Sequence, residues 1–309
     1  MSAAPEPPPV PALITVNFHP DRLLADGRTV AACLAADGVY RTQFETGISN
    51  GGLNAAIGGA RERWERQMFG PDHVGRPIYG ALNLGGHPDG AAPRFGSCHL
   101  VLRPAVASRA TFSHGDSHTE PSIVGTWPAF GAIWQALLDD VTRYGSALAV
   151  SSPAPDDWVS TISARTEAFA EWTSGPAPFA PGRAMDWYVE AQVHGGVTLR
   201  DDVTAVVADP SFRGTPTEAE LASLGVPLRW HPGFTLAAGA VPAVLRAPEL
   251  HDFARFVADR YQRPVLDAAL VGRAARSVVR SSDVWARFGP PADVLQLVKY
   301  LWHVLVLFG

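Results

Sequence analysis

Cysteine, lysine and long hydrophobic runs are all scarce in this chain of 309 residues. The two cysteines, Cys33 and Cys98, provide neither a disulfide framework nor a Cys-x-x-Cys metal knuckle. Lys299 is the single lysine, and the 25 lysines and arginines are outnumbered by 30 aspartates and glutamates. A net charge of −5 without a basic stripe makes a nucleic-acid-binding domain a poor interpretation.

Signals for secretion and for membrane insertion are also missing. The first eleven residues contain five prolines but no basic residue and no apolar run, so they predict an extended, mobile arm and not a signal peptide. Residues 294–308 are strongly apolar, but they include Lys299 and His303 and are too short to span a bilayer. We therefore expect a buried terminal helix and no membrane partner.

The composition nevertheless supports a folded protein with a substantial core, because 47% of the residues are hydrophobic and 18% are charged. Strands and helices are expected without the regular alternation of a parallel α/β sheet, which indicates the α+β class. Strands are expected at residues 13–18, 39–44, 76–84, 96–102, 109–113, 186–194 and 203–208. Helices are expected at residues 20–37, 53–69, 128–144 and from 248 onward, with a Pro- and Ser-rich surface excursion at 151–183.

The most informative segment is the predicted late strand, which reads Trp-Tyr-Val-Glu-Ala-Gln-Val-His-Gly from residue 187 to 195. Side chains alternate between the two faces of a strand, so one face carries Glu190, Gln192 and His194. The other face is apolar and consists of Trp187, Val189, Ala191 and Val193. The polar row fits the wall of a cleft, although the solvated face of an antiparallel strand is an open alternative.

Two earlier segments also suggest a ligand site. At residues 109–117, Thr111 and Ser113 flank the ring of Phe112, which suits a ligand floor but also an ordinary strand followed by a turn. At residues 40–52, Arg41 precedes a glycine-rich loop containing Ser49 and Asn50. A guanidinium and closely spaced backbone N–H groups suit a diphosphate, although a surface arginine beside a flexible loop is the simpler alternative.

Several common catalytic motifs are absent, namely the Walker lysine loop, Gly-x-Gly-x-x-Gly, His-Glu-x-x-His and Gly-x-Ser-x-Gly. The chain therefore does not read as a P-loop, Rossmann, zincin or α/β-hydrolase protein. His114, Asp116 and His118 alternate along the chain, which leaves a metal-dependent hydrolase as an alternative.

Taken in order, these segments resemble the Arg–Ser–Glu class of ADP-ribosyltransferases. Its pattern is matched by Tyr40-Arg41, then by Thr111-Phe112-Ser113, and late in the chain by Glu190-Ala191-Gln192. Longer stretches are similar to the bacterial effector family that attaches ADP-ribose to a threonine of ubiquitin and blocks ubiquitination. They read YRTQFETGISNGG, RERWERQMFG, RPIYGALNL, PRFGSCHLVL, RATFSHGDS and EAQVHGGVTL.

The resemblance implies an α+β fold with a split mixed sheet, and it implies NAD as substrate without a metal. On this reading Arg41 pairs with the phosphates, and Thr111 and Ser113 order the site. Glu190 binds the ribose and stabilises its cation, with Gln192 beside it. Further cofactor contacts would come from Ser49, Asn50, Tyr79 and Phe112.

The resemblance also implies the organisation of the chain and its partners. We expect a Pro-rich arm at 1–12, a catalytic core at 13–215 and a mainly helical extension at 216–309 packed on the core. The expected protein is a monomer made in the bacterial cytoplasm and exported to act on ubiquitin or another host protein.

Two departures from the family pattern matter. The late strand is Glu-x-Gln and not Glu-x-Glu, which puts arginine as the acceptor in doubt and suits a hydroxyl acceptor better. It also leaves open whether Glu190, Gln192 or the earlier Glu45 occupies the catalytic position. A catalytically inactive relative that binds ubiquitin or another partner is a further alternative.

Overall fold

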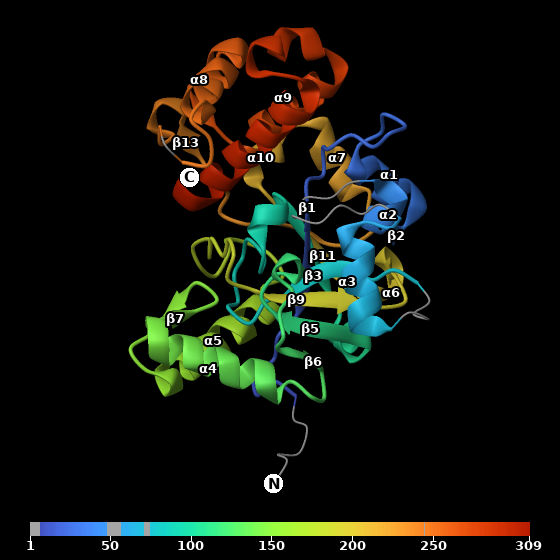
Figure 1. Cartoon of the computed structure of the whole chain (residues 1–309), viewed down its shortest axis with the longest axis vertical. Coiled ribbons are helices and arrows are strands. Elements are labelled where there is room, and N and C mark those ends of the chain that lie inside the picture. The colour runs from blue at the N-terminus through green and yellow to red at the C-terminus, as the bar shows by residue number, and fades with distance from the viewer. Residues whose placement is uncertain (1–6, 48–56, 71–74, 244) are drawn as a thin grey trace.

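A computed structural model describes residues 7–47, 57–70, 75–243 and 245–309. The protein is built around a mixed sheet of eight strands in the order β12-β11-β4-β1-β3-β9-β5-β6 (Figure 1). Neighbouring strands are antiparallel except for β11 and β12, which are parallel. Their bounds are β1 Ile14–Phe18, β3 Ile78–Leu82, β4 Cys98–Leu102, β5 Ala110–His114, β6 Val124–Thr126, β9 Val189–Val193, β11 Val203–Ala208 and β12 Leu228–Trp230. The α+β class predicted from the sequence is confirmed.

Short strand pairs complete the β structure outside the main sheet. They are β2 (Val39–Tyr40) with β10 (Val197–Thr198), β7 (Ser146–Ala147) with β8 (Val150–Ser151), and β13 (Leu236–Ala237) with β14 (Val265–Leu266). The strand predicted at 39–44 is therefore wrong in its second half. Thr42 and Glu45 form a reciprocal capping box there, which begins the short helix α2 (Gln43–Thr46) instead.

The first long helix also starts later than predicted. Thr29 accepts a hydrogen bond from the Ala32 backbone N–H and begins α1 (Val30–Asp37), whereas residues 20–29 are not helical. Gly38 ends the helix in the left-handed region, at φ 66°, as its position in the sequence predicts. Helix α3 (Ala60–Phe69) then ends at Gly70.

Two helices pack together at the lower end of the molecule in Figure 1. Helix α4 (Gly131–Tyr144) matches the prediction closely, and Gly145 ends it at φ 67°. Helix α5 (Pro155–Glu171) lies where a surface excursion is predicted, and that prediction is wrong. One face of α5 is polar and faces solvent, whereas its other face is a buried stripe that consists of Trp158, Ile162, Thr166 and Phe169.

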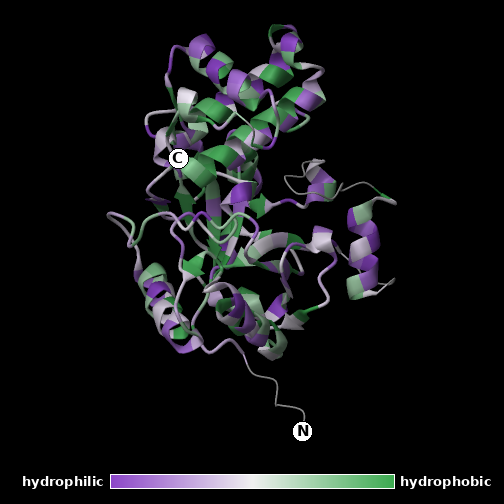
Figure 2. Cartoon of the chain, turned by 60° about the vertical axis from the view of Figure 1, so that its left-hand side comes forward, coloured by the Kyte–Doolittle hydropathy of each residue, from purple (hydrophilic) through white to green (hydrophobic). Residues whose placement is uncertain are grey.

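The C-terminal part is mainly helical and occupies the upper end of the molecule in Figure 1. It contains α7 (Pro216–Ala222), α8 (Leu250–Tyr261), α9 (Ala268–Arg280) and α10 (Pro291–Phe308), whose hydrophobic positions are shown in Figure 2. Helix α10 is long and apolar enough to cross a membrane by length and composition alone, but half of it is buried inside the protein. The predicted buried terminal helix is confirmed.

Within the described residues, segments near the start and the end of the chain are packed against the rest of the protein. Val10 and Ala12 are buried in the main core, so this part of the proline-rich arm packs against the protein, whereas an extended free arm is predicted. Trp302 of α10 donates a hydrogen bond to the carbonyl of Pro93 at 2.9 Å. Strand β12 follows residue 215 and still pairs with the main sheet, so the sheet continues past the expected end of the core.

Candidate functional site

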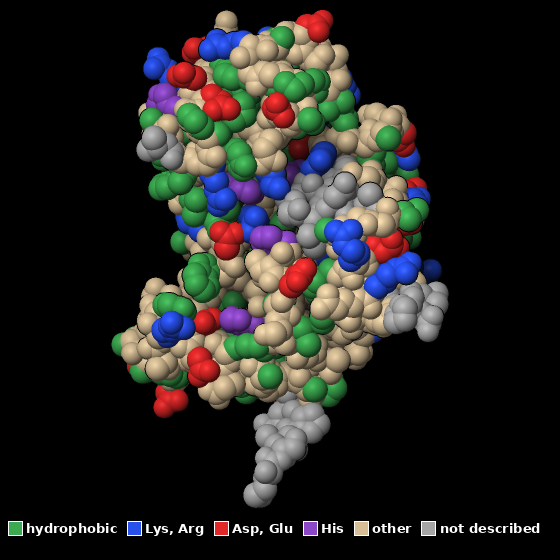
Figure 3. Space-filling model, in the orientation of Figure 1, with side chains coloured by type: hydrophobic (Ala, Val, Ile, Leu, Met, Phe, Trp, Pro, Cys, Tyr) green, Lys and Arg blue, Asp and Glu red, His purple; other side chains and the backbone are tan. Residues whose placement is uncertain are grey.

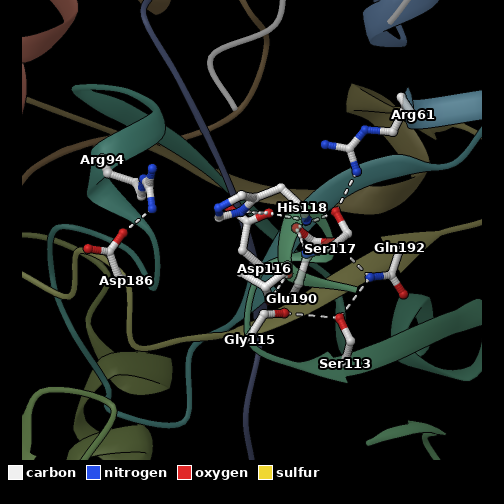
Figure 4. A network of polar contacts seen from close by, with 11 residues as sticks. Arg61, Arg94, Ser113, Gly115, Asp116, Ser117, His118, Asp186, Glu190 and Gln192 are labelled. Atoms are coloured by element: carbon white, nitrogen blue, oxygen red, sulfur yellow. Dashed lines mark hydrogen bonds and ion pairs between the residues drawn. The ribbon is translucent and has the colours of Figure 1, made fainter. Parts of the chain in front are cut away.

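The polar residues of the middle and late motifs meet across strands β5 and β9. The register places Thr111 opposite Gln192 and Ser113 opposite Glu190. The Thr111 hydroxyl donates to Gln192 Oε1 at 2.9 Å. Gln192 Nε2 donates to Glu190 Oε1 at 3.0 Å and to Ser113 Oγ at 3.3 Å (Figure 4). Because both faces of β9 are buried, the alternative of a solvated strand is wrong.

Glu190 is held on its other side by the turn that follows β5. The backbone N–H and the hydroxyl of Ser117 both donate to Glu190 Oε2, at 3.3 Å and 3.2 Å. Burial and the nearby charge of Asp116 raise the pKa of Glu190 to about 7, although Arg61, Gln192 and Ser117 oppose that rise. Glu190 is thus a fixed carboxylate that titrates close to neutral pH.

Asp116 is the second buried carboxylate of the site. Its Oδ1 lies 3.0 Å from His118 Nδ1 and accepts a hydrogen bond from the His118 backbone N–H at 2.9 Å. Burial favours the neutral acid, but the hydrogen bonds and charge supplied by His118 hold the pKa of Asp116 below its ordinary value. The two carboxylates therefore have pKa values displaced in opposite directions, an arrangement typical of acid–base sites.

Arg61 completes the site from helix α3, and the sequence analysis missed it. Its side chain is buried, its guanidinium donates to Ser117 Oγ, and its guanidinium carbon lies 4.0 Å from the centre of the Tyr79 ring. The Tyr79 hydroxyl in turn donates to Glu65 at 2.9 Å. Arg61, Trp64 and Glu65 follow helical i, i+3, i+4 spacing, which was the available sign that these charged residues share the buried face of Trp64.

These groups open into a pocket with about 1110 Å³ of empty volume, counting its mouth. Its lining includes Tyr40, Arg41, Arg61, Tyr79, Asp116 and Glu190. All three motifs are therefore connected. Residues of the first and the last line the same pocket, and Thr111 and Ser113 of the middle motif hold Gln192, which donates a hydrogen bond to Glu190. The predicted contacts Ser49 and Asn50 lie outside the described residues.

Arg41 does not lie on a strand and does not extend freely into the pocket. It follows β2, its guanidinium pairs with Asp37 at 2.9 Å and with Glu45 at 3.7 Å, and about half of its side chain is exposed. Glu45, the alternative catalytic residue, is also half exposed and is occupied by the capping box of α2. The burial and rigid support expected of a catalytic carboxylate belong to Glu190.

Two aromatic assignments from the sequence are wrong. Phe112 is fully buried on the face of β5 opposite to Thr111 and Ser113, and the centre of its ring lies 5.6 Å from that of Phe130. It is therefore not a ligand floor. Trp187 precedes β9, is 55% exposed and lies beside Tyr144, so it does not belong to the apolar face of the strand. The aromatic side chains of the pocket lining are instead Phe18, Tyr40, Tyr79 and Phe95.

The three residues of the metal-dependent alternative do not converge. His114 pairs with Asp140 at 2.8 Å, whereas His118 pairs with Asp116. Across the described ranges, no group of three or more histidine, cysteine, aspartate or glutamate side chains is placed to hold a metal ion.

The fold and the site together define an α+β protein with a buried carboxylate pair at the base of a pocket. Residues 13–308 match a family described as a protein of unknown function (DUF3626), and the chain belongs to this family. The chain is 27% identical over 193 residues to the Gene 2 protein of Mycobacterium phage D29. It is 28% identical over 184 residues to the Gene 2 protein of Mycobacterium phage L5. These alignments cover 62% and 57% of this chain, and the chain spans 62% and 61% of the two phage proteins.

Proposed function

We propose that this protein is a mono-ADP-ribosyltransferase that transfers ADP-ribose from NAD to a hydroxyl group of a protein. The observation that carries the proposal is the cross-strand cluster of Thr111, Ser113, Glu190 and Gln192, which presents one buried carboxylate to a pocket. The Arg–Ser–Glu resemblance leaves Glu190, Gln192 and Glu45 as candidates, and Glu190 is favoured because its carboxylate is buried, held by hydrogen bonds and part of the pocket lining. The proposal includes the finer architecture, in which the eight strands correspond to the split sheet of that class.

The proposed reaction needs a fixed negative charge beside the ribose. The bond between ribose C1′ and the nicotinamide nitrogen breaks, nicotinamide leaves with the electron pair, and C1′ becomes cation-like, as in glycoside hydrolysis. Ionised Glu190 stabilises this cation and binds the ribose 2′-hydroxyl. The acceptor oxygen then bonds to C1′, and its proton passes to the Glu190 carboxylate.

The hydrogen bonds around Glu190 support this role. Gln192 and Ser117 hold its two oxygens from opposite sides, so the carboxylate is preorganised before substrate arrives. Arg61 anchors Ser117 and places a positive charge near the carboxylate, which favours its ionised form. Arg41 is the resemblance-based candidate for the phosphates, but its pairing with Asp37 and Glu45 leaves that assignment with weaker support.

We further propose a threonine of ubiquitin as the acceptor. Gln192 stands where arginine-specific relatives carry an acidic residue, and both of its amide ends are already engaged by Thr111, Ser113 and Glu190. A neutral amide does not attract a guanidinium, so a hydroxyl acceptor fits better. The acceptor would be met in a host cell after export from the bacterium.

The test is incubation of the full chain with labelled NAD and a eukaryotic lysate. The proposal expects a discrete labelled protein band and release of nicotinamide, with both lost in Glu190→Gln. No labelled band and no nicotinamide above the blank would overturn it. Binding of NAD without nicotinamide release would favour an inactive partner-binding protein, and loss of activity with a chelator would favour a metal-dependent enzyme.

A further inference from the structure

A cluster of basic side chains lies at the junction between the sheet and the C-terminal helices. Figure 3 shows Lys, Arg and His side chains gathered in the hollow between the upper helices and the sheet. The cluster comprises Arg22 after β1, Arg94 in the 3₁₀ helix η1 (Pro93–Phe95), Arg246 before α8, and Lys299 in α10. The proposed reaction gives none of them a role.

Contacts around Trp302 bring these segments together. Its indole N–H bonds to the Pro93 carbonyl, directly before Arg94, and its ring lies 5.1 Å from that of His19. Lys299 precedes Trp302 by three residues on α10, and His303 follows it. The basic residues of α10 are thereby fixed against η1 and the end of β1.

The cluster borders the pocket that holds Glu190, through Arg22 and through the neighbours of Arg94. His19 and Arg22 line this pocket, and so do Ala92, which precedes η1, and Phe95, which follows Arg94 within η1. Phe95 also contacts the ring of Tyr188, two residues before Glu190. A ligand bound at Glu190 can therefore extend toward these cations.

Two cations of the cluster, Arg94 and Arg246, share one acidic partner. Asp186 is shared by two guanidiniums, because Arg94 pairs with one of its oxygens and Arg246 lies 4.0 Å from the other. In the part of the chain that the structure describes, Arg94 Nε and both ring nitrogens of His303 are buried without a hydrogen-bond partner. Buried orphan polar groups of this kind are costly unless a ligand satisfies them.

The pKa shifts of His303 and Lys299 reflect the other cations of the cluster nearby. Burial, together with the charges of Arg94, Arg246 and Lys299, lowers the pKa of His303 to about 3. A neutral imidazole donates one N–H and does not add a further positive charge to the cluster. Burial and, to a smaller extent, the nearby charges of Arg94 and Arg22 lower the pKa of Lys299, whereas the charge of Asp116, which lines the pocket, opposes this change.

We propose that Arg94, Lys299 and His303, with Arg22 and Arg246 beside them, form a diphosphate-binding site for the dinucleotide. This inference rests on the proposed function, and it assigns the phosphates of NAD to the junction and not to Arg41. Arginine supplies paired charge-assisted hydrogen bonds to phosphate oxygens, and lysine supplies a point charge. The C-terminal helices thereby contribute residues to the substrate site.

The test is calorimetric titration of the full chain with ADP-ribose, and separately with inorganic pyrophosphate. The double variant Arg94→Gln/Lys299→Gln is expected to bind ADP-ribose about 10- to 100-fold more weakly, since two charged hydrogen-bond donors are lost. Arg41→Gln is expected to lose less than about threefold, and Arg28→Gln, which removes an exposed pair with Asp26, serves as the surface control. Lys299→Gln alone provides a milder variant if thermal melting shows that the double variant is misfolded.

Each outcome bears on the assignment. Unchanged ADP-ribose binding in folded Lys299→Gln and in the double variant would overturn the site, as would a larger loss in Arg41→Gln. A third result is that the wild type binds pyrophosphate but neither NAD nor ADP-ribose, and that the variants lose pyrophosphate binding. This result would support an anion site at the junction. It would overturn the dinucleotide as the ligand of that site, and it would overturn the proposed function.

Discussion

Glu190 and Glu45 are chemically identical but differ in their surroundings. Glu190 is 4% exposed and is held by Gln192 and Ser117, whereas Glu45 is half exposed at the start of a four-residue helix. A charged group that is held in place before the reaction stabilises the transition state more effectively, because the group does not have to reorient as the reaction proceeds. Substitution of Glu190 and of Glu45 by the same residue therefore gives a matched pair of variants for testing the catalytic assignment.

Glu190→Gln keeps the size of the side chain but removes its negative charge. We expect turnover of NAD to fall by about two to four orders of magnitude, the usual scale for a preorganised electrostatic group. Glu45→Gln is the control and should stay within about threefold of the wild type. Steady-state nicotinamide release, with folding checked by thermal melting, measures both, and near-normal turnover in Glu190→Gln would move the catalytic assignment elsewhere.

The pH dependence should also depend on Asp116. Only ionised Glu190 stabilises a cation, so activity is expected to rise as the pH passes through about 7. Asp116→Asn removes the charge that helps to raise the pKa of Glu190, while Asn retains the ability to cap the turn at 117–119. Its pH–rate profile should shift to lower pH, and a profile that stays in place or moves upward would argue against this coupling.

The same burial has a cost in stability. The pKa of Glu190 is raised from 4.5 to about 7, so its contribution to folding is fully present below about pH 4.5 and is lost as the pH rises to about 7. The difference corresponds to about 3 kcal/mol at most. Glu190→Gln should therefore raise the free energy of unfolding at pH 8 but change it little at pH 4, as measured by urea denaturation. A destabilised variant at pH 8 would contradict this.

At the scale of elements, helix α9 packs against the chain after β1 through a close approach at Gly272. A Cβ at this position would lie 1.9 Å from Asp21 Oδ2, the oxygen that accepts a hydrogen bond from Arg276 at 2.6 Å. Asp21 is almost fully buried, so it has little room to move. The absence of a side chain at Gly272 is thus required by packing.

Gly272→Ala is expected to destabilise the protein by about 1–3 kcal/mol, as overpacking does, despite the higher helix propensity of alanine. Gly131→Ala, at the start of α4, is the matched control because its Cβ would meet nothing within 4 Å. It should be neutral or slightly stabilising. Thermal melting of the two variants tests the comparison, and equal melting temperatures would show that α9 adjusts without cost.

The elements also show what the sequence can and cannot predict. Alternation along residues 189–193 correctly grouped Glu190 with Gln192, and Gly38 and Gly145 correctly marked helix ends, because these signals are local. The contact of Arg61 with Ser117 joins residues 56 positions apart, and no local pattern contains it. The sequence does not predict helix α5, because the prolines and serines in and around it obscure a buried stripe at helical spacing.

At the scale of the whole molecule, the sheet and the C-terminal helices act as one unit. The family match extends over residues 13–308, whereas the resemblance to the transferases covers residues 13–215. Trp302 and His19 join α10 to the edge of the pocket, and the basic cluster of the junction lies between the two parts. Although the net charge of the chain is −5, this basic cluster borders the pocket that is lined by the buried carboxylates Asp116 and Glu190.

The central claim is transfer of ADP-ribose to a protein hydroxyl, and the most direct measurement is a mass spectrum of ubiquitin after incubation with the full chain and NAD. We expect a mass increase of one ADP-ribosyl group, mapped by peptide fragmentation to a threonine and absent with Glu190→Gln. An adduct on arginine would contradict the hydroxyl acceptor. Unmodified ubiquitin, with no nicotinamide released in the presence of lysate, would contradict the transferase itself.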